Sequence, residues 1–148
     1  MKYILDTDIL SYFLKNHPLV VKRFRATDPD DIATTVINYA ELLFGVYKAE
    51  NIEQKLPGIQ AFLETLTVVN FDKRAGETFA QLKTTLQKSG NILADMDLII
   101  ASICVANGWI LVTNNTKHFE KIERLAIENW SIPSDEVEPT GQDTLLNN

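Results

Sequence analysis

The sequence contains few of the residues that build disulfides or zinc sites. Its 148 residues include one cysteine, Cys104, and two histidines, His17 and His118. A single cysteine excludes an internal disulfide and a thiolate zinc cluster, and neither histidine lies at the spacing of a metal-ligand pair. Because Cys104 falls within an apolar helical pattern, we expect it to be a small residue of the core.

Long apolar runs are also missing. The longest apolar stretch, 98–106, is far shorter than a membrane span, and Asp6 and Asp8 interrupt the N-terminal segment before it reaches signal-peptide length. We therefore expect a cytoplasmic protein that does not contact a membrane. A content of 45% hydrophobic and 23% charged residues is typical of one globular domain. We place this domain at 1–130 and a flexible acidic tail at 131–148.

An excess of basic residues is the third absence. The formal net charge of −6 argues against a nucleic-acid partner, since Lys and Arg normally drive phosphate binding. However, the segment from Ser134 onward carries several of the acidic residues and no basic one, so the rest of the chain is nearly balanced. If three of its acids bind one or two divalent cations, the local charge becomes neutral or positive.

Short apolar runs alternate with amphipathic segments along the chain. This alternation predicts an α/β fold, a parallel sheet of four to five strands sandwiched by helices. The predicted strands are 2–5, 32–35, 67–70, 109–113 and 126–130. The first predicted helix begins at its cap, Asp8, and runs to Leu14, and a short helix through Val21 and Phe24 follows it. The later helices are predicted at 37–47, at 52–66, from the Asp72 cap to Gly90, and at 96–107 with Asp95 as its N-cap.

Acidic side chains fall where a parallel sheet of this kind binds ligands, beyond the carboxyl ends of its strands. Asp6 follows the first strand, Glu41 lies on the helix after the second, and Asp97 opens the helix that leads into the fourth. Like charges brought together cost stability unless a cation offsets them. Hard oxygen ligands favour Mg²⁺ or Mn²⁺, and such a site suits phosphodiester hydrolysis. Polar residues that could support it are Thr7, Asp8, Asp95, Thr113 and Asn115.

Glu41 is the most informative of these acids. Its helix, 37–47, is apolar nearly all round, so we expect it to leave no face to solvent. A carboxylate in that setting is protonated, paired or bound to metal, and Gly45 one turn on leaves room for a ligand. The alternative is a capping box, with Asn38 as N-cap and Glu41 at the third helical position.

Four blocks of the sequence resemble, in order and spacing, the PIN-domain ribonucleases, and most closely the VapC toxins of bacterial toxin–antitoxin pairs. The resemblance covers about residues 1–130. The blocks are 3–10 (YILDTDIL), 38–45 (NYAELLFG), 95–102 (DMDLIIAS) and 110–119 (ILVTNNTKHF).

This resemblance implies that Asp6, Glu41 and Asp97 form an acidic triad that binds Mg²⁺ or Mn²⁺ and cleaves RNA, tRNA included, leaving a 5′-phosphate and a 3′-hydroxyl. It also implies a VapB-like antitoxin and a homodimer. Two positions depart from the family pattern. Asn115 stands where many relatives have a fourth acid, and Asp8 stands where such toxins usually have Asn.

Three residues after the fourth predicted strand are candidates for contacts to RNA. Lys117, His118 and Lys121 lie just beyond the acidic edge and could contact phosphates.

A strand that ends in Asp-x-Asp also opens haloacid-dehalogenase-like phosphatases, although Leu10 stands where that motif has Thr or Val. A non-catalytic binding module on the same fold is the third possibility. The chain has no Gly-rich phosphate loop and no nucleophile triad, which excludes P-loop and acyl-transfer enzymes.

Overall fold

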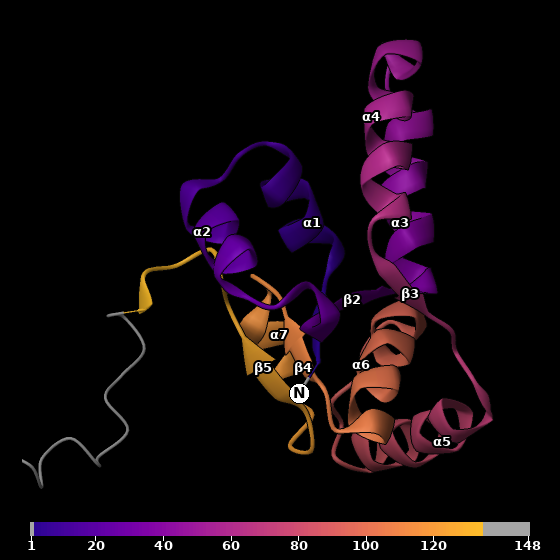
Figure 1. The fold of residues 1–148 in the computed structure, drawn as a ribbon. Helices are drawn as coiled ribbons and strands as arrows, with labels where there is room; N and C mark the ends of the chain where they lie inside the picture. The colour runs from indigo at the N-terminus through magenta and orange to yellow at the C-terminus, as the bar shows by residue number, and fades with distance from the viewer. Residues whose placement is uncertain (1, 135–148) are drawn as a thin grey trace, which may run out of the picture.

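The computed structural model describes residues 2–134, which form one parallel sheet with helices on both faces (Figure 1). Along the sheet the strands lie in the order β3-β2-β1-β4-β5, and every neighbouring pair is parallel. The predicted α/β fold and all its predicted strands are therefore confirmed. The strands are β1 (Tyr3–Leu5), β2 (Ile32–Thr35), β3 (Thr67–Val69), β4 (Ile110–Val112) and β5 (Ala126–Glu128).

The helices connect the strands and bury the two faces of the sheet. Alternate residues of β1 point to opposite faces, so Ile4 joins one core and Leu5 the other. The helices are α1 (Thr7–Leu14), α2 (Pro18–Ala26), α3 (Val36–Tyr47), α4 (Ile52–Glu64), α5 (Lys73–Lys88), α6 (Asp95–Asn107) and α7 (Thr116–Phe119), with a short 3-10 helix η1 (Pro29–Asp31) before β2.

The core beneath Ile4 is made with α5 and α6, and both helices form as their patterns predict. Asp72 caps α5, because its carboxylate accepts a hydrogen bond of 2.9 Å from the Ala75 backbone N–H. Cys104 lies on α6 and is fully buried, as expected. The second core, beneath Leu5, is made with α1, α2 and α4.

The pair α3 and α4 extends away from the sheet as a projecting arm (Figure 1). Asn38 and Leu42, near the start of α3, are buried against the body of the protein. Phe44 and Tyr47, near its end, are 65% and 56% exposed. The expectation that α3 leaves no face to solvent is therefore wrong, because Leu42 and Val46 are buried along the helix while Phe44 and Tyr47 face solvent.

Two helix caps differ from the prediction. The N-cap of α1 is Asp6 and not Asp8, since the Asp6 carboxylate accepts a hydrogen bond of 2.9 Å from the Thr7 N–H. The N-cap of α6 is Ala94 and not Asp95, which is the first residue of the helix. The short helix α7, which the sequence pattern does not reveal, begins directly after the polar residues that follow β4.

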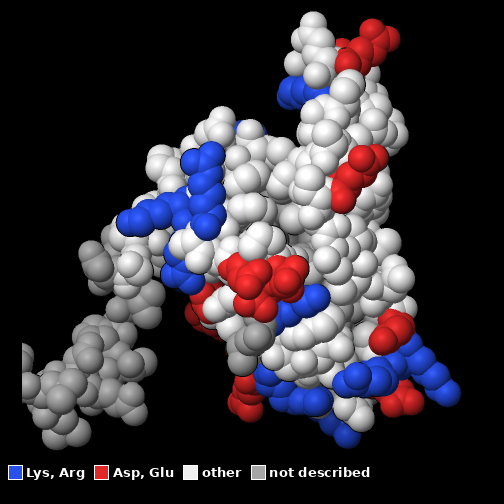
Figure 2. Space-filling view, in the orientation of Figure 1, with Lys and Arg blue, Asp and Glu red and all other residues white. Residues whose placement is uncertain are grey.

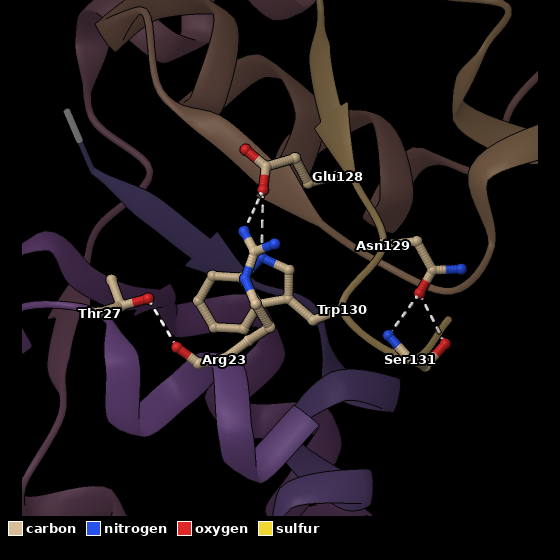
Figure 3. A network of polar contacts seen from close by, with 6 residues as sticks. All are labelled: Arg23, Thr27, Glu128, Asn129, Trp130 and Ser131. Carbon is tan, nitrogen blue, oxygen red and sulfur yellow. Dashed lines mark hydrogen bonds and ion pairs between the residues drawn. The ribbon is translucent and has the colours of Figure 1, made fainter. Parts of the chain in front are cut away.

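Polar contacts hold the end of β5 to α2 (Figure 3). Glu128 Oε1 accepts hydrogen bonds from Arg23, at 2.9 Å, and from the indole Nε1 of Trp130, at 3.2 Å. The Arg23 guanidinium also lies 5.4 Å from the centre of the Trp130 ring. Ser131, the first residue of the predicted tail, donates its backbone N–H to Asn129. Residues 135–148, most of that tail, lie outside the described residues.

The helices of residues 2–134 include none that is long and apolar enough to cross a membrane.

Replacing either of two glycines by alanine should change stability, in opposite directions. Gly108 ends α6 with φ of 67°, a left-handed conformation that costs other residues energy, so Gly108→Ala should lower the free energy of unfolding by about 1 kcal/mol. Gly76 lies inside α5, where an added methyl group meets nothing within 4 Å. Gly76→Ala should therefore raise the free energy of unfolding by about 0.5–1 kcal/mol. Urea unfolding measures both, and shifts of the same sign would contradict the assignment.

Candidate active site

The carboxyl ends of the three middle strands meet around Asp6. This residue follows β1, the central strand, and its backbone N–H donates a hydrogen bond of 2.9 Å to the Val112 carbonyl of β4. Its side chain is held between α3, which begins after β2, and Thr113, which follows β4. Asp6 is only 9% exposed, so its charge must be satisfied by partners that the protein supplies.

Three donors from three segments of the chain satisfy the Asp6 carboxylate. Oδ1 accepts hydrogen bonds from the Thr7 backbone N–H at 2.9 Å and from the Asn38 side-chain amide at 2.8 Å. Oδ2 accepts one of 2.8 Å from the Thr113 hydroxyl. Burial, the largest effect, raises the pKa of Asp6, and the nearby charge of Asp97 adds to the rise, whereas these hydrogen bonds oppose it. The orientation of the carboxylate is therefore determined by its surroundings.

Asn38 is fixed in turn by the start of α3. The Thr35 hydroxyl oxygen accepts a hydrogen bond of 3.1 Å from the Asn38 backbone N–H, which makes Thr35 the N-cap, and the same hydroxyl donates to Asn38 Oδ1 at 2.7 Å. The capping box with Asn38 as N-cap and Glu41 three residues later is therefore wrong. Glu41 lies beyond the first turn of α3, so the helix end does not explain its presence.

Glu41 has an oxygen atom, Oε1, that is buried and has no hydrogen-bond partner among the described residues. Burial raises the pKa of Glu41 first, and the negative charges of Asp6 and Asp97 raise it further, while the Thr7 side chain opposes them. A buried, unsatisfied carboxylate oxygen is uncommon in folded proteins and calls for a proton or a cation. Asp6, Glu41 and Asp97 therefore lie close enough for their charges to interact.

Asp97 lies in the first turn of α6 and is paired with His118, which the sequence placed just beyond the acidic edge only as a possible phosphate contact. Its Oδ2 lies 2.9 Å from Nε2 of His118, on α7. The spacing of the histidines gave no sign of this contact, because α7 brings His118 back over the carboxyl edge of the sheet. The one available signal was that His118, like Thr113, closely follows a strand that ends at this edge.

Asp8 joins the same edge to the loop after β4. Its Oδ1 accepts a hydrogen bond of 2.7 Å from the Ile9 N–H and its Oδ2 one of 3.0 Å from the Asn114 N–H. Burial, and next the charge of Asp6, raise the pKa of Asp8 to about 6. Asn115 touches the site through its backbone, whose N–H donates a hydrogen bond of 3.1 Å to the Thr113 hydroxyl. Asp8 is thus a fourth acid beside the three predicted ones.

The remaining predicted residues lie outside this set of contacts. Asp95 is exposed and forms an ion pair of 3.0 Å with Lys83 of α5. Lys117 and Lys121 are exposed. Among residues 2–134, no three His, Cys, Asp or Glu side chains lie close enough together to hold a metal ion without moving. The partnerless Glu41 oxygen and the mutually repelling acids nevertheless fit a cation, since both are relieved by positive charge.

The surface charge is mixed rather than basic overall. Figure 2 shows basic side chains gathered over α2 and a group of acidic side chains near the centre of the view, with both signs mixed over α5. Broad electrostatic attraction of a polyanion is therefore weak, in keeping with the net charge of −6. Binding of nucleic acid has to depend on individual basic residues near the acids.

Comparison with known proteins places this arrangement in a family. Residues 3–125 match the PIN domain family. The chain is 34% identical over 131 residues to Ribonuclease VapC2 of Haemophilus influenzae, with 88% of this chain and 98% of that protein covered. It is 30% identical over 131 residues to the tRNA(fMet)-specific endonuclease VapC of Shigella flexneri, with 88% and 99% covered.

Solved structures agree with the sequence matches. The crystal structure of VapBC2 from Rickettsia felis bound to a DNA fragment from its promoter superposes with a TM-score of 0.81 at 34% identity, covering 88% of this chain and 99% of that one. The DNA-bound VapBC from Salmonella typhimurium gives a TM-score of 0.82 at 29% identity, covering 88% and 98%.

The raised pKa values predict how stability depends on pH. The folded chain holds protons on Asp6, Asp8 and Glu41 more tightly than the unfolded chain does, so their contribution to stability is present below pH 4 and is lost as pH rises through the folded pKa, which for Asp8 is about 6. The melting temperature of the metal-free Asp8→Asn variant should therefore fall less between pH 4 and 7 than that of the unaltered protein. Asp30→Asn, at an exposed aspartate, is the control, and identical curves for Asp8→Asn and the unaltered protein would refute the prediction.

Removing the Thr113 hydroxyl should reveal the cost of losing its hydrogen bonds to Asp6 and to the Asn115 N–H. Thr113→Val deletes the donor to Oδ2 and leaves a buried carboxylate oxygen unsatisfied, so it should lower the free energy of unfolding at pH 7 by about 1–3 kcal/mol. Thr113→Ser keeps a hydroxyl and should lose less. Equal losses in the two variants, measured by urea unfolding, would show that packing rather than the hydrogen bond is responsible.

Proposed function

The chain belongs to the PIN-domain family, and from this membership we propose that it is a metal-dependent endoribonuclease, the toxin of a toxin–antitoxin pair. The observation that carries the proposal is the partnerless buried oxygen of Glu41, placed within electrostatic reach of Asp6 and Asp97. The haloacid-dehalogenase-like phosphatase is set aside, because the family match to the PIN domain extends over residues 3–125.

Asp6, Glu41 and Asp97 would hold the cation, Mg²⁺ or Mn²⁺, which supplies an activated water molecule and neutralises the phosphate. The chain's own residues position these acids. Asn38 and Thr113 hold the Asp6 carboxylate in one orientation, and His118 fixes one oxygen of Asp97. Hydrogen bonds of this kind orient the carboxylates that would bind the metal and so determine where the attacking water molecule would lie relative to the phosphate.

We also propose the partners of this enzyme. The curated relatives are named ribonucleases, one of them specific for tRNA(fMet), which supports RNA as the substrate and tRNA as the first candidate. The solved relatives are VapBC complexes, which supports a VapB-like antitoxin as the protein partner. A homodimer and a cytoplasmic location complete the proposal. Lys117 and Lys121, exposed on and just after α7 and beside His118, remain proposed phosphate contacts.

Cleavage of RNA by the purified full-length chain, free of any antitoxin, tests the function. We expect discrete products from tRNA or total RNA with Mg²⁺ or Mn²⁺ and none with a chelator. Asp6→Asn, Glu41→Gln and Asp97→Asn should each reduce the rate by about 100-fold or more, because each removes a charged ligand. Asp95→Asn is the matched control, since Asp95 begins the same helix as Asp97 but pairs with Lys83.

Each rival function has its own signature in this experiment. Folded protein that binds RNA but leaves it intact under every metal condition would identify the non-catalytic binding module. Hydrolysis of a simple phosphomonoester at a comparable rate, abolished by Asp6→Asn, would revive the phosphatase. Cleavage that survives all three substitutions would move the site away from these acids.

A further inference from the structure

A groove beside the carboxylates leads from them along the projecting arm. It has a volume of about 550 Å³ and lies between α1 on one side and α3 and α4 on the other. Thr7 and Glu41 line it at the active site, and Lys15 and Lys55 line it as well. Resting on the proposed function, we propose that this groove binds the RNA strand next to the cleaved bond, with Lys15 and Lys55 contacting its phosphates.

The two lysines are the first argument, because neither is engaged elsewhere. Both are exposed, and the side chain of neither forms an ion pair or hydrogen bond with any residue of 2–134. Arg23 and Lys83, by contrast, form ion pairs with Glu128 and Asp95, and neither of them lines the groove. Because the chain is acidic overall, unpaired cations beside the carboxylates are where phosphates would gain most.

The walls of the groove are the second argument. Gly45 and Gly58 both line it, and a side-chain carbon added to either would meet nothing within 4 Å. The groove is therefore open where these residues lack side chains, and a strand can approach the backbone of α3 and α4 closely. Leu14 and Ile59 offer apolar surface against which ribose and bases can pack. Packing of this kind does not depend on the base sequence of the RNA.

Direct continuity with the site is the third argument. Glu41 belongs both to the groove and to the group of acids that would hold the cation, so a phosphodiester at the acids necessarily has neighbouring nucleotides at the mouth of the groove. An acidic peptide from a protein partner is the competing occupant. The two unpaired cations on opposite sides, Lys15 just after α1 and Lys55 on α4, favour the regularly spaced charges of a nucleic-acid backbone.

The double variant Lys15→Gln/Lys55→Gln tests the proposal in the full-length chain. Binding of an end-labelled single-stranded RNA oligonucleotide is measured by fluorescence anisotropy without metal, and cleavage of the same RNA is measured with metal. We expect Kd and KM to rise about tenfold and kcat to change less than about twofold. The slope of log Kd against log salt should fall by about 1.4, the value for two phosphates on a single strand. Lys73→Gln/Lys88→Gln, at the two ends of α5, is the matched control.

A second pair of variants fills the groove without changing its charge. Gly45→Leu places a side chain in the open space and should weaken RNA binding about tenfold, while circular dichroism shows that the fold is intact. Gly76→Leu makes the same change inside α5, where there is equal space and no groove residue, and should leave binding unchanged.

The outcomes separate this proposal from the proposed function. If the unaltered protein cleaves RNA while the lysine variant keeps its Kd, KM and salt dependence, the groove assignment is wrong and the nuclease stands. If the unaltered protein binds RNA with the expected salt dependence but cuts nothing, the groove assignment stands and the nuclease does not. Unchanged RNA binding with weakened binding of an antitoxin would identify the groove as a protein site and overturn the assignment.

Discussion

One buried negative charge organises the site, the Asp6 carboxylate at the end of the central strand. Water cannot stabilise it, so the protein must, and the donors come from the start of α1, from α3 and from the residue after β4. Those segments are distant in sequence and meet because β2 and β4 flank β1 in the sheet. The strand order thus has a direct chemical consequence, since it supplies a hydrogen bond to each oxygen of one carboxylate while leaving lone pairs available for a ligand.

The same arrangement leaves the neighbouring Glu41 without enough hydrogen-bond donors. Asp6 and Asp97 both raise the pKa of Glu41, and its buried oxygen has no donor within the described part of the chain. Stability alone would favour a neutral side chain at such a position. The acids are therefore best understood as a site prepared for positive charge, whose electrostatic cost in the metal-free protein is the counterpart of its affinity for a cation.

Local patterns predict much of this fold, and contacts between distant elements account for what they miss. The strands, the Asp72 cap and the acids beyond the strand ends could be predicted, because each depends on residues within a few positions. The partnership of Asn38 with Asp6 and that of His118 with Asp97 could not, since each joins two elements whose relative placement depends on packing. The exposure of Phe44 was missed for the same reason, because apolar composition does not say which faces of a helix its neighbours cover.

An acidic protein that acts on a polyanion needs basic residues to bind it in addition to the acidic residues that would hold the metal. The acids repel RNA most strongly in the metal-free protein, and the basic side chains over α2 are partly neutralised, as Arg23 is by Glu128. Unpaired lysines near the acids can then contribute affinity without disturbing the charges that would hold the metal, because exposed charges are screened over about 8–10 Å at physiological salt. Their positions just after α1 and on α4, on the two sides of a groove that reaches Glu41, separate the lysines that would contact the strand from the acids that would act on it.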